Sequence, residues 1–193
     1  MYKRKYTGKG IGVAILDTGI FPHIDFGRRI LAFCDFTEGK SGPYGTHVSG
    51  ILGGDGTASQ GRYKGAAPGC GIVALKVLDR FVNGSREDVL QAFQWIEDFG
   101  KIYNIRIVNI SVGTTSRSMN EQTDLLAGVE QLWDKGFTVV AAAGNQGPGD
   151  GTVTAPGSSR KIITVGSSDM LQGNKAVSGR GPTFECVCKP DLV

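Results

Sequence analysis

The chain has 193 residues, enough for one substantial core and too few for two large domains. Its 40% hydrophobic and 20% charged residues are typical of an ordinary globular protein. A net charge of +3 gives no basic footprint for nucleic acid, and no apolar run reaches membrane-spanning length, so we expect neither partner. No charged-then-apolar signal segment opens the sequence, so we expect a cytoplasmic location, or a secreted one if an omitted leader precedes it.

Apolar runs alternate with helical patterns along the chain. The run 11–16 predicts a strand buried on both faces, and the glycine-rich segment 45–52 predicts the opening of a buried helix. Ser85 and the acids after it are typical of a helix start, and Ser118 with Glu121 indicates another capping box. The other predicted strands are 29–36, 72–78, 105–110, 137–143 and 161–165. This alternation predicts an α/β fold of three layers, a mainly parallel sheet with helices on both faces.

Polar residues follow three of these strands directly. Asp17 ends the first strand, Ser111 follows the fourth and Asn145 follows the fifth. The carboxyl ends of parallel strands share one edge, where such sheets place their ligands, so we expect the three residues around one cleft. A carboxylate and a neutral amide there suit chemistry in which negative charge develops on an oxygen. The competing interpretation is that Asp17 and Asn145 merely open turns.

The cysteines are Cys34, Cys70, Cys186 and Cys188. Cys186 and Cys188 are too closely spaced for an easy mutual disulfide, and no C-x-x-C pair or histidine partner indicates a zinc site. We expect free thiols in a reducing compartment and no metal site.

Several short motifs occur in one order along nearly the whole chain. They are Val13-Ala14-Ile15-Leu16-Asp17-Thr18-Gly19, Gly45-Thr46-His47-Val48-Ser49-Gly50, Asn109-Ile110-Ser111-Val112-Gly113, Ala141-Ala142-Ala143-Gly144-Asn145, Ser178-Gly179-Arg180-Gly181-Pro182 and Lys189-Pro190-Asp191-Leu192. In this order the chain resembles the subtilisin-like serine proteases, the subtilase family. The resemblance implies a subtilisin-like fold, a serine endopeptidase activity and a polypeptide substrate.

The resemblance also assigns roles to residues. Asp17 matches the triad aspartate and Asn145 the oxyanion-hole amide. The segments Ser111-Val112-Gly113 and Ala142-Ala143-Gly144 match opposite walls of the first specificity pocket, and Gly84-Ser85 lies where the family offers a second edge strand to substrate. A pro-domain partner is possible by the same resemblance. Calcium is possible by resemblance only, because no carboxylate cluster in the sequence matches a site.

Two departures from the family pattern concern the other members of the triad. The family's catalytic histidine opens a His-Gly-Thr-His sequence, whereas Tyr44 precedes Gly45 here and His47 matches the second, non-catalytic histidine. The family's serine lies in a Gly-Thr-Ser-Met-Ala segment, which does not occur before Val193. We therefore expect residues 1–193 to form a single catalytic domain that is incomplete, lacking the serine segment and the loop before Gly45.

Three alternatives stay open beside this prediction. In the first, the chain is a catalytically dead subtilase-like module that binds peptides. In the second, His47 takes the role of the base. A nucleotide-binding α/β domain is disfavoured, because no G-x-G-x-x-G follows the first strand and Asp17 would repel a phosphate.

Overall fold

The computed structural model describes residues 6–37, 46–114, 119–168 and 177–193. The described chain forms two compact units, residues 1–108 and 109–193. The junction of Tyr44 with Gly45 lies outside the described residues. The predicted capping box of Ser118 with Glu121 also lies outside the described residues and side chains. No helix in the described ranges is both long enough and apolar enough to span a membrane.

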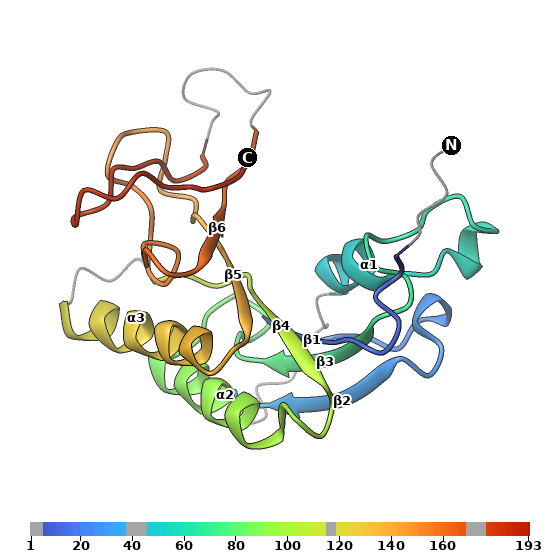
Figure 1. Ribbon diagram of the computed structural model, residues 1–193. Coiled ribbons are helices and arrows are strands. Elements are labelled where there is room, and N and C mark those ends of the chain that lie inside the picture. Colours follow the sequence, from blue (N-terminus) through green and yellow to red (C-terminus); the bar gives the residue numbers. More distant parts are fainter. Residues whose placement is uncertain (1–5, 38–45, 115–118, 169–176) are drawn as a thin grey trace. The chain divides into compact units, whose positions relative to one another are not determined.

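The strands follow the order β2-β3-β1-β4-β5-β6, and β1 pairs with β3, β2 with β3, and β5 with β6, each in parallel register. Their bounds are β1 Gly12–Asp17, β2 Ile30–Asp35, β3 Gly71–Lys76, β4 Ile105–Ile110, β5 Thr138–Ala142 and β6 Ile163–Val165. The helices are α1 His47–Gly53, α2 Arg86–Phe99 and α3 Met119–Asp134 (Figure 1). The α/β fold with a mainly parallel sheet is confirmed.

In the first unit β1 is buried on both faces, as its unbroken apolar run predicts. Residues Val13 to Leu16 are at most 2% exposed. On one face of the sheet, Val13 and Ile15 pack in a core with Ile72 and Ala74 of β3 and with Phe26. The outer strand β2 alternates half-buried and exposed side chains, and Leu31 and Phe33 are each 42% exposed. An edge strand covered on one face gives this alternation.

Helix α2 begins as the sequence predicts. The Ser85 hydroxyl accepts a hydrogen bond from the backbone N–H of Asp88, and the Asp88 carboxylate accepts one from the backbone N–H of Ser85. The reciprocal pair satisfies N–H groups that have no partner within the helix. The apolar face of α2 is buried through Val89, Phe93 and Ile96.

In the second unit α3 packs on β5, and its predicted apolar residues Leu125, Val129 and Leu132 are buried. Beyond β6 the chain returns beside this strand, where Leu192 forms a parallel bridge with Val165. The backbone N–H of Gly166 donates to the carbonyl of Leu192 at 2.8 Å.

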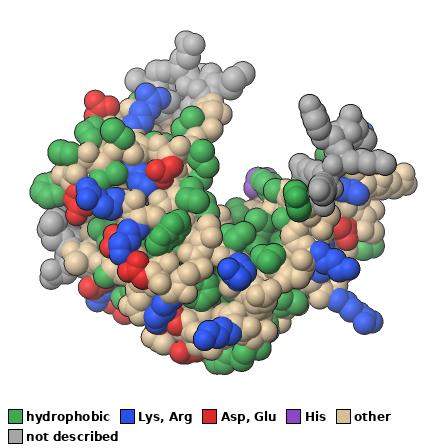
Figure 2. All heavy atoms as spheres, viewed as in Figure 1, with side chains coloured by type: hydrophobic (Ala, Val, Ile, Leu, Met, Phe, Trp, Pro, Cys, Tyr) green, Lys and Arg blue, Asp and Glu red, His purple; other side chains and the backbone are tan. Residues whose placement is uncertain are grey.

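Figure 2 shows basic and acidic side chains interspersed on the drawn face rather than gathered by sign.

Candidate active site

Asp17 is the last residue of β1, half-buried at the carboxyl end of the strand. Its Oδ1 accepts hydrogen bonds from the backbone N–H of Thr18 at 2.6 Å and from the Thr18 hydroxyl at 3.2 Å. Its backbone carbonyl accepts from the N–H of Val77 at 3.0 Å. Thr18 therefore holds the carboxylate and Val77 the backbone of Asp17, at the end of the strand where parallel sheets present ligand-binding groups.

A buried cation supports the same end of this sheet. Lys76 pairs with Asp17 in the register of β1 and β3, and its side chain is only 1% exposed. Its Nζ lies 2.9 Å from the Asp35 carboxylate and donates a hydrogen bond to the Thr37 hydroxyl. Burial alone raises the pKa of Asp35, but the hydrogen bonds from Thr37 and Lys76 and the positive charge of Lys76 outweigh this effect and lower that pKa. This ion pair ties the ends of β2 and β3 together.

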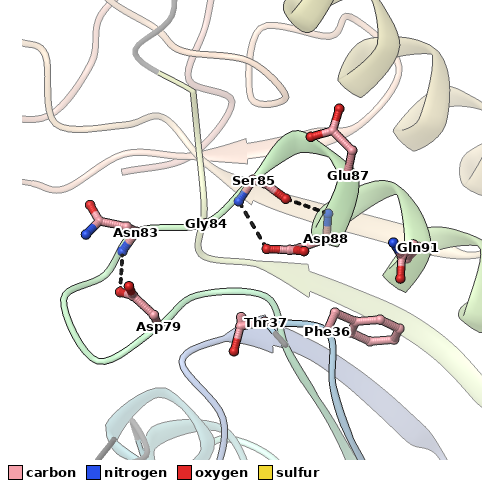
Figure 3. A pocket seen from close by; sticks show the side chains of 9 residues that line it. All are labelled: Phe36, Thr37, Asp79, Asn83, Gly84, Ser85, Glu87, Asp88 and Gln91. Carbon is pink, nitrogen blue, oxygen red and sulfur yellow. Dashed lines mark hydrogen bonds between the residues drawn. The ribbon is translucent and has the colours of Figure 1, made fainter. Parts of the chain in front are cut away.

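Gly84 and Ser85 border a pocket of about 620 Å³ within the first unit (Figure 3). Its lining comprises Phe36, Thr37, Asp79, Asn83, Gly84, Ser85, Glu87, Asp88 and Gln91. The carboxylates of this lining are engaged locally: Asp79 accepts from the backbone N–H of Asn83 at 3.0 Å, and Asp88 caps α2. A hydrogen bond from Arg86 lowers the pKa of Glu87. Ser85 has an extended backbone, with φ −97° and ψ 157°, although it belongs to none of the described strands.

In the second unit the segment Ser111-Val112-Gly113 leaves β4 at its carboxyl end. The Asn109 side-chain amide donates to the Ser111 hydroxyl at 3.1 Å. Directly after Gly113, the backbone N–H of Thr114 donates to the carbonyl of Ala155 at 2.9 Å.

The segment Ala142-Ala143-Gly144 leaves β5, and Asn145 follows it with an exposed side chain. Gly144 has φ +87°, in the left-handed region that favours glycine. Its carbonyl accepts from the backbone N–H of Gly179 at 2.9 Å, and the Ala143 carbonyl accepts from that of Thr154 at 3.1 Å. The turn that presents Asn145 is thus fixed by two neighbouring segments.

Thr154 lies at the candidate site, although the sequence analysis did not identify it as a site residue. A Cβ on Gly113 would lie 2.7 Å from the Thr154 Oγ1, and one on Gly144 would lie 2.2 Å from the same atom. This hydroxyl oxygen is buried and has no hydrogen-bond partner among the residues that the structure describes. The structure therefore brings the two predicted wall segments together at Thr154. No short sequence motif predicts this position for the threonine, because it contacts residues that are distant in the sequence.

Each predicted residue thus has a defined place within its own unit. Asp17 ends β1 in the first unit, whereas Ser111 and Asn145 follow β4 and β5 in the second. That the three share one cleft stays a prediction. His47 is exposed at the first position of α1. Within the described ranges no group of three or more His, Cys, Asp or Glu side chains is arranged to hold a metal ion.

Comparison with known proteins gives the same family over nearly the whole chain. The model of the subtilase family matches residues 8–193. The serine protease AprX of Bacillus subtilis is 37% identical over 206 aligned residues, covering 97% of this chain and 46% of AprX. A subtilisin of Bacillus sp. strain TA39 is 32% identical, covering 89% of this chain and 41% of that protein. The chain spans less than half the length of these curated relatives.

Solved structures agree with the sequence comparisons. Sphericase superposes with a TM-score of 0.72 at 27% identity, covering 96% of this chain and 63% of that structure. A cold-adapted subtilisin-like serine proteinase superposes with a TM-score of 0.75 at 24% identity, which bears on the fold alone. With the family model matched from residue 8 to residue 193, the chain belongs to the subtilase family of serine proteases.

Proposed function

We propose that this chain supplies the aspartate and the oxyanion-hole amide of a serine endopeptidase. The observation that carries the proposal is the family match over residues 8–193. Asp17, at the end of β1, and Asn145, three residues after β5, would serve as the family's aspartate and asparagine. The histidine and the serine of the triad would come from segments outside the 193-residue sequence, one before Gly45 and one after Val193.

In the proposed reaction Asp17 accepts a hydrogen bond from Nδ1–H of the histidine and holds that ring in the tautomer that removes the proton of the serine hydroxyl. The serine oxygen then attacks the carbonyl carbon of the peptide bond. The side-chain amide of Asn145 donates a hydrogen bond to the oxygen on which negative charge develops, and this bond strengthens as the tetrahedral intermediate forms. The exposed position of the Asn145 side chain leaves its amide accessible to a substrate.

The substrate would be an extended polypeptide. Segments 111–113 and 142–144 would wall its first specificity pocket, with Thr154 lying against both, and Gly84-Ser85 would offer a second edge to its backbone. Extended peptides bind sheet edges through main-chain hydrogen bonds, which favours cleavage of unstructured segments.

A catalytically inactive, peptide-binding subtilase is the second candidate, favoured by one observation. Tyr44 occupies the position before Gly45 at which the family has its catalytic histidine. A tyrosine with a pKa of about 10 does not replace imidazole as a base near neutral pH.

Reaction with a fluorophosphonate probe separates the two candidates. Sequencing and intact-mass analysis of the natural gene product establish whether it carries the additional segments. A product that carries them should label at a serine beyond Val193 and cleave unstructured peptides, and substitution of that serine should abolish both. A natural product in which Tyr44 is bonded directly to Gly45, and which binds peptides without labelling, would establish the inactive module instead.

A further inference from the structure

The hairpin loop of residues 181–189 carries two exposed cysteines that the proposed protease chemistry does not use. Cys186 and Cys188 are both free and exposed, separated by Val187. The other two thiols are more enclosed: Cys70 is buried and Cys34 half-buried, and burial raises the pKa of both. Cys186 and Cys188 are therefore the accessible thiols, and thiolate is the form that binds metals.

Backbone hydrogen bonds hold this hairpin loop in one geometry. The N–H of Gly181 donates to the carbonyl of Lys189 at 2.9 Å, and that of Thr183 donates to Val187 at 2.9 Å. The N–H of Cys186 closes the tip by donating to the carbonyl of Thr183 at 2.8 Å. At its base, the buried ammonium of Lys189 donates to the Ile162 carbonyl at 2.7 Å. These hydrogen bonds therefore fix the backbone that carries the two cysteines.

Cys186 occupies a backbone position that favours glycine. Its φ is +58°, in the left-handed region, at the third position of a three-residue loop between Thr183 and Val187. Such hairpin loops place glycine there, because a side chain in this conformation is disfavoured. A cysteine in this conformation is less stable than a glycine would be. Its thiol is exposed, so packing of the side chain does not offset this loss.

The spacing of the pair allows both thiolates to reach one cation. Two residues separated by one other have Cα atoms at most about 7 Å apart. A metal with bonds of about 2.3 Å to each sulfur holds the two sulfur atoms about 3.8 Å apart in tetrahedral geometry and at most about 4.6 Å apart, a separation that two side chains so near in sequence can reach. Soft thiolate ligands select thiophilic cations over the hard cations that oxygen ligands bind.

We propose that Cys186 and Cys188 form a two-thiolate site for a soft, thiophilic metal cation. On binding, each thiol releases its proton to solvent and each sulfur forms one bond to the cation, with no change in oxidation state. Solvent or a further ligand completes the coordination. The site is separate in its chemistry from the proposed triad and does not depend on the protease activity.

Titration of the reduced 193-residue chain with Cd²⁺ alone tests the proposal, followed by the ultraviolet absorbance of cadmium–thiolate bonds. We expect one Cd²⁺ per chain at this site and no competition from excess Ca²⁺. Because the second thiolate binds at high effective concentration, Cys186→Ser and Cys188→Ser should each weaken binding by at least about 10²-fold. Cys34→Ser, which removes a thiol elsewhere, should leave the affinity unchanged.

Cys186→Gly provides a variant that keeps the hairpin folded. Glycine relieves the left-handed strain, so the Tm should rise by about 2–4 °C while Cd²⁺ affinity falls as in Cys186→Ser. Retention of wild-type affinity in either single serine variant would overturn the proposal. Binding of two Cd²⁺ ions by independent thiols, or a Cys186–Cys188 disulfide that persists in mild reductant and blocks Cd²⁺, would overturn it equally.

Discussion

Removal of the Asp35 carboxylate should destabilise the first unit far more than removal of its partner, the Lys76 ammonium. The lysine side chain is 1% exposed and that of the aspartate 25% exposed. In Asp35→Ala a buried ammonium loses its counter-charge, and breaking a buried pair in this way costs about 3–5 kcal/mol. Because water partly reaches the aspartate position, we expect the lower end, about 3 kcal/mol. In Lys76→Met the remaining carboxylate can be hydrated, and we expect a loss of about 1 kcal/mol.

Urea unfolding followed by Trp95 fluorescence measures this difference, since Trp95 stacks on Tyr103 within the first unit. A loss of 3 kcal/mol should lower the unfolding midpoint by about 1–2 M urea at unchanged slope. The lowered pKa of Asp35 also fixes a pH dependence: its contribution is fully present above the unfolded-state pKa and is lost as pH falls through the folded-state pKa. The gap between wild type and Asp35→Asn should therefore close in acid. Equal losses in Asp35→Ala and Lys76→Met would refute the reasoning.

Three further predictions concern the candidate site. Gly144→Ala should destabilise the second unit by more than about 1 kcal/mol in thermal unfolding, because of its positive φ and the clash with Thr154, and Thr154→Ala should recover part of the loss. Ser85→Ala should cost about 1 kcal/mol in the same assay through the lost helix cap, whereas Ser85→Gly should cost only a few tenths. In a natural product that carries histidine and serine, Asp17→Asn should lower kcat about 10⁴-fold and Asn145→Ala about 10²–10³-fold with little change in KM, magnitudes taken from the well-studied serine proteases, a subtilisin among them. Full activity in either variant would remove that residue from the proposed mechanism.

The sequence predicted those features that depend on neighbours along the chain. The run before Asp17 is apolar at every position, so its burial on both faces followed directly, and the cap of α2 depends only on Ser85 and Asp88. The sixth strand was predicted too long, since β6 begins at Ile163. Lys161 instead lies at the surface, where its ammonium pairs with Asp134 at 2.9 Å.

Features that depend on distant contacts were not predictable in this way. Lys76 interrupts an apolar run and would be expected to face solvent, yet it is buried because Asp35 and Thr37 reach it from 41 and 39 residues away. Thr154 has no motif of its own, and its place beside Gly113 and Gly144 follows from the packing of three separate segments. The single-domain prediction and the shared cleft remain predictions for the same reason, since both depend on how the two units are arranged.

The position of the Asn145 amide depends on the residues that hold the turn after β5. Gly144 turns the chain out of β5 with a left-handed backbone, so that Ala143 is buried while Asn145 is exposed. Hydrogen bonds from the backbones of Thr154 and Gly179 hold this turn on either side. Displacing a catalytic donor by about 1 Å is enough to lower turnover about 10²-fold. In a natural product that carries histidine and serine, substitutions that shift Gly179 should therefore reduce turnover with little effect on substrate affinity, the pattern expected if Asn145 is the proposed donor, whose hydrogen bond matters chiefly in the transition state.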